Sequence, residues 1–511
     1  MMRRLTIRLL FPRKRATVFQ TPASGESRSV QRRLKTRHLS MIAIGGSIGT
    51  GLFMASGSAI HSAGPGGALL AYAAIGVMVY FLMTSLGEMA TYLPTSGSFA
   101  TYAARFVDPS LGFALGWNYW FNWVITVAAD ISIAALVITY WEPMRFMAPW
   151  GWSLLFFGLI LLLNLLSVRA FGESEYWFAL IKVVTVVVFL GIGTLTIFGI
   201  LGGEYVGLAN FTVGDAPFLG KGFSGSFLTA LGVFLIAGFS FQGTELIGVT
   251  AGESENPKES IPKAIKQVFW RILIFYILAI LVIGLLIPYT NPALLGAENV
   301  QEIAKSPFTL VFERAGLAFA AAIMNAVILT SILSAGNSGM YASTRMLYAM
   351  GNDGLAYRLF GRTNRAGVPV AAVLATAVVA LLVFLIEIVN EGAYEYIVAA
   401  SGMTGFIAWL GIAASHYRFR RAYLAQGRRL DDLVYRAKWF PLGPLLALAL
   451  CVLVIIGQDT QLVLEGDFNW QRLLITYMGL PIFAGFYLYH KLRHKTHLIP
   501  LKEVDLSQNV D

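Results

Sequence analysis

Two glycine-rich stretches interrupt apolar segments of this 511-residue chain: GGSIGTG at residues 45–51 and GFSFQGTE at residues 238–245. The interior of a bilayer tolerates non-helical backbone only where that backbone is buried in protein or lines a cavity. Corresponding breaks in the two halves of a polytopic membrane protein are typical of the substrate site of a secondary transporter. The alternative is that these glycines only allow helices to pack closely, which explains two clustered breaks at matching positions less well.

The composition indicates an all-α polytopic membrane protein. Hydrophobic residues make up 57% of the chain and charged residues 13%, and the mean hydropathy is +0.66, which is far more apolar than an ordinary soluble protein. A helix needs about 20 apolar residues to cross the hydrocarbon core. Such stretches predict about twelve transmembrane helices, centred near Ile48, Val79, Trp123, Leu161, Val187, Leu235, Ala279, Leu329, Ala380, Trp409, Leu453 and Phe483.

The positions of the basic residues predict the orientation in the membrane. A net charge of +10 would suit a nucleic-acid partner, but with the N-terminus in the cytosol the great majority of the 38 Lys and Arg residues fall on the cytosolic side, Arg271 among them. We therefore expect both termini in the cytosol and no nucleic-acid partner. The single cysteine, Cys451, excludes an internal disulfide and a cysteine metal cluster, and we expect no cofactor and no metal.

The break positions also predict the organisation of the chain. Five helices separate the two breaks, and because an odd number of helices reverses the direction of entry, two five-helix units form a 5+5 inverted repeat. The expected division is a basic cytosolic tail in contact with membrane lipid at residues 1–38, a first repeat at 39–202, a second, inverted repeat at 203–417, two extra C-terminal helices at 418–490, and a cytosolic C-terminal tail at 491–511.

Unwound backbone at the two breaks suits a ligand that carries both charges. The amides of Thr50 and Gly51 begin a half-helix, whose positive end attracts a carboxylate. Freed carbonyl groups at Ser47, Phe239 and Gln242 would accept from an ammonium group. Phe239 is either a lid over the substrate or a packing residue. The substrate-binding residues predicted at the breaks are Ser47, Ile48, Gly49, Thr50, Gly51, Phe239, Ser240 and Gln242.

Lys182 is a basic residue inside the fifth predicted span. Ionisable residues in a membrane are costly and mark functional sites by default. The ammonium of Lys182 would take the place of a bound sodium ion, so that its protonation couples transport to a proton gradient. The alternative is a fixed structural cation that backbone carbonyl groups stabilise.

Carboxylates occur in the spans as well. Asp130 and Glu245 are expected to bind the side-chain ammonium of a cationic substrate or to relay protons, and the residues alone do not divide these roles. The alternatives are that Asp130 is a buried partner for a helix hydroxyl or for Lys182, and that Glu245 braces the broken helix. Glu88 and Glu253 lie near the cytosolic boundary, where a gate or a surface ion pair is expected, and both are left outside the site.

The residues around the breaks carry a family resemblance. The run RHLSMIAIGGSIGTGLF at residues 37–53 resembles the first helix of the bacterial amino acid permeases of the amino acid, polyamine and organocation superfamily. Three further runs agree: GFSFQGTELIG at 238–248 with AGESENP at 251–257, SAGNSGMYASTRMLY at 334–348, and SGMTGF at 401–406. The resemblance covers roughly residues 34–497 and implies a leucine-transporter-like fold.

Other phrases, GWNYW at 116–120, FGESEYWF at 171–178 and HYRFRR at 416–421, are most similar to members that transport lysine. The resemblance implies proton symport of L-lysine across the bacterial cytoplasmic (inner) membrane. It matches Lys182 to the fifth-helix lysine of the family and Asp130 to its third-helix carboxylate. The chain departs from the pattern in a longer, more basic N-terminal tail, and in Asn291, where the resemblance implies an aspartate.

Alternative functions stay open at this point. One is a permease for another amino acid, such as arginine, histidine, or an aromatic or neutral one. Another is a sensor that binds lysine and signals through a regulatory membrane-protein partner. The spans show no phosphate loop, metal cluster or nucleophile with a paired base, so we do not expect an enzyme.

Overall fold

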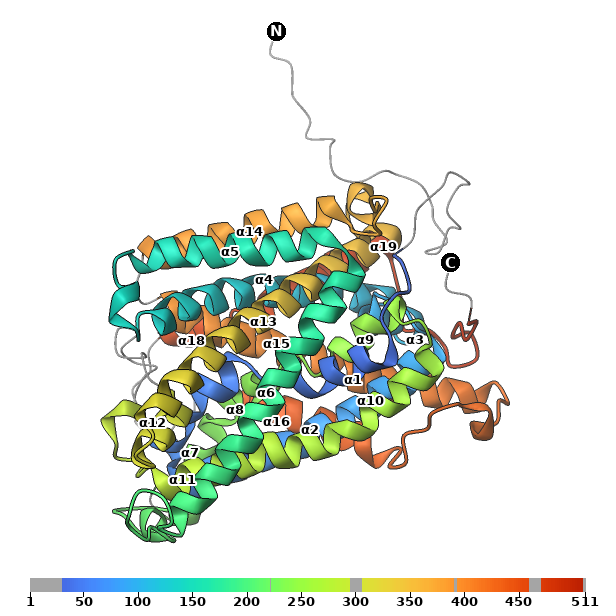
Figure 1. Cartoon of the computed structure of the whole chain (residues 1–511). Coiled ribbons are helices and arrows are strands. Elements are labelled where there is room, and N and C mark those ends of the chain that lie inside the picture. The colour runs from blue at the N-terminus through green and yellow to red at the C-terminus, as the bar shows by residue number, and fades with distance from the viewer. Residues whose placement is uncertain (1–29, 221, 295–305, 390–392, 459–469, 509–511) are drawn as a thin grey trace.

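The computed structural model describes residues 30–220, 222–294, 306–389, 393–458 and 470–508. In these ranges the backbone is helical apart from turns, loops and one isolated bridge between Leu34 and Ser254 (Figure 1). The predicted all-α class is confirmed. The α-helices are α1 Thr36–Gly45, α2 Ser56–Tyr92, α3 Ser98–Phe106, α4 Pro109–Ile138, α5 Pro149–Leu166, α6 Val168–Ile197, α7 Gly222–Gly232, α8 Phe234–Phe241, α9 Leu246–Thr250, α10 Pro257–Arg271, α11 Leu278–Leu286, α12 Pro307–Arg314, α13 Ala318–Asn352, α14 Val370–Val389, α15 Ala393–Ala425, α16 Leu442–Ile456, α18 Trp470–Tyr477 and α19 Gly479–His494.

Many of these helices are long enough to cross a membrane. Within the described ranges, seven helical segments have the length and apolar composition of a span, and the chain is a multi-pass membrane protein. Each predicted centre lies in a described helix except Ile48, which lies in the first break. α2 contains a kink at Gly64 (φ 75°) and Pro65, so it joins what the sequence divides into two spans. The total of twelve spans stays a prediction.

The first predicted break is present. α1 ends at Gly45, residues 46–49 leave the helix, and a π-helical turn at Gly51–Ala55 leads into α2. The second break is present too, but it begins later than the sequence predicts. Residues 238–241 still belong to α8, and residues 242–245 separate α8 from α9. Gly238 is therefore helical, and the chain leaves the helix at Gln242, where ψ is 146°.

The two breaks lie against each other. Gly243 has φ +93°, and a Cβ atom there would lie 2.9 Å from the carbonyl oxygen of Gly46. A Cβ atom on Gly51 would lie 2.4 Å from the Cα atom of Ser240. Only glycine allows this approach, since it lacks a Cβ atom and tolerates positive φ.

The surrounding helices enclose the breaks. Figure 1 shows α4 and α13, which pack together, running through the middle of the molecule, with α5 and α14 along one edge. α1 packs between α6 and α10, and α8 packs against α2. Chain segments far apart in sequence therefore meet where α1 and α8 end. The inverted repeat stays a prediction.

Parts of both predicted tails belong to the packed structure. Residues 1–29 lie outside the described residues, but Leu34 is fully buried and its amide donates to the Glu253 carbonyl oxygen at 2.9 Å. Near the other end, the Tyr92 hydroxyl donates to the Leu506 carbonyl oxygen at 2.6 Å, and Arg105 pairs with Asp505 at 2.6 Å. The segments at 30–35 and 499–508 thus cover helix ends on the side that we predict to be cytosolic.

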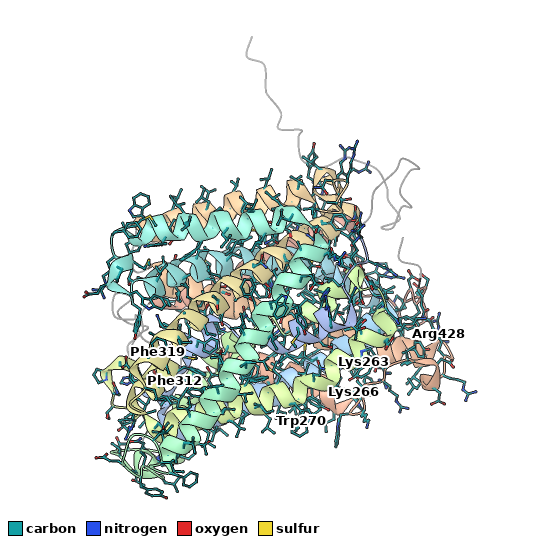
Figure 2. The ribbon with its side chains drawn as sticks, in the orientation of Figure 1. Lys263, Lys266, Trp270, Phe312, Phe319 and Arg428 are labelled. Atoms are coloured by element: carbon teal, nitrogen blue, oxygen red, sulfur yellow. The ribbon has the colours of Figure 1, made fainter. Side chains whose placement is uncertain are left out.

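The outer face of α10 has the pattern of a membrane boundary. Figure 2 shows Lys263, Lys266 and Trp270 pointing away from the molecule, and all three are exposed. Lysines followed one turn deeper by tryptophan are typical of a helix that enters the headgroup region. We therefore expect the start of α10 to lie at a membrane surface.

Candidate functional site

A small cavity lies where the two breaks meet. Its volume is about 30 Å³, which is room for one or two water molecules. Ser47, Gly49, Thr50, Gly51, Asp130, Phe239 and Gln242 line it, together with Gly46, Trp123, Thr126 and Ala335. The structure thus brings seven of the eleven predicted site residues together around one cavity; Ile48, Lys182, Ser240 and Glu245 do not line it.

The first break supplies most of the predicted lining. The Ser47 side chain hydrogen-bonds the Tyr276 hydroxyl at 2.7 Å, and this hydroxyl also donates to the Ser47 carbonyl oxygen at 3.1 Å. A Cβ atom on Gly49 would lie 2.8 Å from that of Ala335, which explains the small residues here. Ile48 is fully buried in the hydrophobic core instead.

Asp130 projects from α4 toward the first break. The Thr50 hydroxyl donates to its Oδ1 atom at 2.5 Å, so the alternative that Asp130 is the partner of a helix hydroxyl holds for this oxygen. Its Oδ2 atom is buried and has no hydrogen-bond partner among the described residues. An unpartnered buried acceptor is costly, and here it lies beside a cavity that this same residue lines.

The second break reaches the cavity through two side chains. Phe239 is 8% exposed and lines it. The side-chain amide of Gln242 donates to the Ser401 carbonyl oxygen of α15 at 3.0 Å. Ser240 is buried away from the cavity, and its hydroxyl bonds that of Tyr72 at 2.8 Å.

Glu245 does not line the cavity, and both of its carboxylate oxygens accept hydrogen bonds from other groups. Its Oε1 atom accepts from the Tyr119 hydroxyl at 3.1 Å and from the Gly243 amide at 3.3 Å. Its Oε2 atom accepts from Trp409 Nε1 at 3.2 Å. These bonds tie the second break to α4 and α15, which favours the brace over substrate contact.

Lys182 touches the first break from α6. It is 1% exposed, and its Nζ atom donates to the Gly45 carbonyl oxygen at 3.1 Å. This is the last residue of α1, where the partial negative charge of a half-helix concentrates. The position suits the predicted cation, whether it titrates or is fixed.

Sequence reasoning missed three groups. Arg271 is counted with the cytosolic residues above, but the structure buries it in the helical segment Pro257–Leu286, where it donates to the Ala43 carbonyl oxygen. The position of Pro257, where α10 begins, could have indicated that Arg271 is buried, because it places Arg271 about four turns along the helix. Trp123 lines the cavity, and Glu175 is buried beside α13.

The two carboxylates near the cytosolic boundary make buried ion pairs, where the sequence suggested a gate or a surface pair. Glu88 accepts from both Arg420 Nε, at 2.6 Å, and Arg420 Nη2. Glu253 accepts from Arg345 Nε at 2.6 Å and from the Tyr341 hydroxyl at 2.6 Å. All four charged groups are at most 3% exposed.

Comparison with known proteins supports the family that these motifs resemble. The amino acid permease family model matches residues 38–502. The chain belongs to the amino acid permease family. It is 56% identical to the lysine-specific permease LysP of Escherichia coli (strain K12), over 95% of this chain and 98% of that protein. It is 52% identical to the histidine permease HisP of Lactococcus lactis subsp. cremoris (strain MG1363), over 94% and 98%.

A solved structure shows the fold of this permease. The crystal structure of the Eremococcus coleocola manganese transporter, in complex with an aromatic bis-isothiourea substituted compound, matches with a TM-score of 0.50. The match covers 90% of this chain and 94% of that one at 14% identity. Such a likeness shows a transporter fold and says nothing of the substrate.

Proposed function

We propose that this permease imports L-lysine across the bacterial cytoplasmic membrane by proton symport with alternating access. The observation that carries the proposal is the cavity between the two breaks, with an unpartnered carboxylate oxygen of Asp130 at its side. The name of the 56% identical LysP supports lysine as the substrate. The breaks would belong to corresponding helices of a 5+5 inverted repeat with two extra C-terminal helices.

The lysine carboxylate would bind the amides of Thr50 and Gly51, at the start of the half-helix that leads into α2. The α-ammonium would bind carbonyl oxygens of the breaks, and the side-chain ammonium would bind Asp130 Oδ2. The aromatic faces of Trp123 and Phe239 add favourable sites for a cation. Thr50, Gly51, Asp130, Trp123 and Phe239 all line the same cavity.

The size of that cavity supports alternating access. A cavity of about 30 Å³ holds water but no amino acid, so the substrate must enter and leave through more open conformations. The π-helical turn after the first break and the non-helical residues of the second are suitable hinges. Lys182 of α6, whose ammonium contacts the end of α1, would carry the coupled proton.

Lysine accumulation in proteoliposomes that contain only this protein tests the proposal. An imposed inward proton gradient should drive accumulation equally with and without sodium. Accumulation that requires sodium would contradict proton symport. The absence of accumulation under the proton gradient, with or without sodium, would contradict it as well. A pure sensor with a signalling membrane partner would bind lysine and accumulate nothing.

A permease for histidine is the second candidate, because HisP is nearly as similar as LysP. Uptake of labelled lysine and of labelled histidine, each measured with an excess of the other unlabelled amino acid, of arginine or of a neutral one, separates the two. Uptake of histidine that excess lysine fails to reduce, with little uptake of lysine, would favour this second substrate.

A further inference from the structure

A second buried carboxylate lies beside the coupling lysine, on the same helix. Glu175 is 1% exposed. Its Oε1 atom accepts from Asn337 Nδ2 at 2.8 Å, and its Oε2 atom accepts from the Ser334 hydroxyl at 2.9 Å. Asn164 Nδ2 in turn donates to Asn337 Oδ1 at 2.8 Å. Both oxygens of Glu175 thus receive donors, and these hydrogen bonds favour the ionised form against the cost of burying the charge.

The geometry of α6 brings this carboxylate near the ammonium of Lys182. The two residues are seven positions apart and share one face of the helix. Lys182 Nζ reaches back to the Gly45 carbonyl group, and Gly45 lies against Ala179, since a Cβ atom on Gly45 would be 2.4 Å from that of Ala179. The ammonium therefore lies near the level of Ala179, about one helical turn, or roughly 5 to 6 Å, from the level of Glu175.

Other charges face Lys182 from neighbouring helices. Asp130 of α4 lies toward the cavity, with one oxygen bound to Thr50. Arg271 of α10 donates to Ala43 on the same end of α1. His38 of α1 lies further toward the start of α6, beside Gly172.

The remaining helices packed on α6 add no charge near the ammonium. α5 and α11 contain no ionisable residues. α13 presents neutral Ser334 and Asn337 here. Glu313 and Arg314 of α12 lie toward the opposite end of α6, where the Arg314 carbonyl group approaches Gly202. Glu175 and Asp130 are thus the carboxylates placed to stabilise Lys182, and Asp130 would be shared with substrate.

We propose that Glu175 is a positioning residue for proton coupling: its carboxylate, fixed by α13, stabilises the Lys182 ammonium and so sets the pH range in which Lys182 carries the transported proton. The inference rests on the proposed proton symport. When α1 moves during the transport cycle, the Gly45 carbonyl group can leave Lys182, whereas Glu175 stays on the same helix. The carboxylate would then be the partner that the ammonium retains throughout the cycle.

Glu175→Gln tests the proposal, because glutamine keeps the volume and one acceptor oxygen for Asn337, its amide can donate to the Ser334 hydroxyl, and the charge is removed. Lysine uptake into proteoliposomes is measured over a series of external pH values under a constant inward proton gradient. We expect the pH of half-maximal uptake to fall by about one unit or more, since at an effective dielectric constant of about 20 a charge within roughly 12 Å is worth at least that much. The matched control is Glu173→Gln, two residues away but partly exposed and paired with Arg37, which should leave the profile unchanged.

Two further measurements keep the outcome decisive. Lysine exchange at equal pH on both sides needs a folded transporter but no net proton movement, and Glu175→Gln should retain it. If Glu175→Gln does not fold, Glu175→Asp replaces it and should shift the profile in the same direction by less.

An unshifted profile in an exchange-competent Glu175→Gln variant overturns the inference. It leaves proton symport standing if the wild type still responds to the gradient and Lys182→Ala does not. A wild type that ignores the proton gradient overturns the proposed function itself. The two failures are therefore distinguishable.

Discussion

Both breaks contain local backbone bonds, such as that from the Ile48 amide to the Gly45 carbonyl oxygen at 3.1 Å, but they differ in the side chains that bind their backbone groups. At the first break, side chains from other helices bind the carbonyl groups: Lys182 of α6 binds Gly45, and Tyr276 binds Ser47. Five residues at and just after this break line the cavity, against two from α8 and the second break. The first break is built for partners that come from elsewhere in the molecule or from outside it.

The second break bonds mainly to itself. The backbone amide of Gln242 donates to the Phe239 carbonyl oxygen, and the backbone amide of Thr244 donates to that of Phe241. The backbone amide of Gly243 donates to the Glu245 side chain. With its groups satisfied locally, this break has less backbone to offer a ligand. We infer that the first break serves binding and coupling. The second break would form one side of the cavity and serve as a hinge between α8 and α9.

The largest effect is expected at the cation of the first break. Lys182→Ala should abolish gradient-driven lysine uptake, a loss well beyond about tenfold, because it removes the ammonium that is bound to the last carbonyl group of α1. Lysine binding should survive, since Lys182 does not line the cavity. Uptake under a pH gradient and equilibrium binding of labelled lysine, measured on the same preparation, check both parts.

The matched control is Lys263→Ala, which removes an exposed lysine of α10 paired with Glu259. It should leave uptake and binding unchanged, because exposed ion pairs contribute little. Gradient-driven uptake by Lys182→Ala that equals the wild type at every pH would remove the coupling role.

The next effect is expected at the carboxylate beside the first break. Asp130→Asn keeps the shape and can still accept from Thr50, but it loses the charge that would bind an ammonium. A charge-assisted hydrogen bond is worth about 1.5 to 3 kcal/mol, so lysine affinity should fall by roughly 10- to 150-fold. Isothermal titration with lysine measures it, and a change below about threefold would mean that Asp130 serves Thr50 alone.

Much of this comparison could be predicted from the sequence. Glycines at 45–51 and 238–245 in apolar segments predict both breaks. Unwound backbone inside a membrane is tolerated only where it is buried in protein or lines a cavity, and glycine allows the close approach that this requires. Residues within and just beside these runs form most of the cavity lining. The exact start of the second break could not be predicted, since residues 238–241 suit a helix as well as a loop and tertiary contacts decide.

The partners of the ionisable residues could not be predicted. Sequence position indicates that Glu245 is buried, but not that Tyr119, Trp409 and Gly243 surround it. The same holds for Glu175, whose partners on α13 lie about 160 residues away in the chain. Long-range contacts of this kind depend on how helices rotate about their axes, which a faint hydrophobic period in all-apolar helices does not specify.

A third prediction concerns the brace of the second break. Glu245→Gln places an amide donor among three donors, so about 1 to 2 kcal/mol of stability should be lost, while lysine affinity changes by less than about threefold. Thermal unfolding of the solubilised protein and lysine titration measure the two quantities. If affinity falls as far as in Asp130→Asn while the unfolding temperature stays unchanged, Glu245 is a substrate ligand and the division between the two breaks is wrong.

The smallest effects come from a matched pair of serines, one on each side of the comparison. Ser47 at the first break bonds the Tyr276 hydroxyl at 2.7 Å, and Ser240, at the end of α8, bonds that of Tyr72 at 2.8 Å. Ser47→Ala and Ser240→Ala each remove the bond to a tyrosine hydroxyl and should cost about 0.5 to 1.5 kcal/mol, the usual net worth of a hydrogen bond. Ser240 also donates to the Ile236 carbonyl oxygen of its own helix at 3.1 Å, but that carbonyl group keeps its helical surroundings in the variant. Thermal unfolding should not tell them apart.

Transport should separate these two variants, because Ser47 lines the cavity and Ser240 does not. Ser47→Ala frees Tyr276 to turn and leaves the Ser47 carbonyl group less firmly placed, so the KM for lysine should rise by about two- to fivefold. Ser240→Ala should leave KM within error of the wild type. Equal KM changes in both variants would show that the two breaks contribute alike, and the distinction between a binding break and a structural break would then have to be given up.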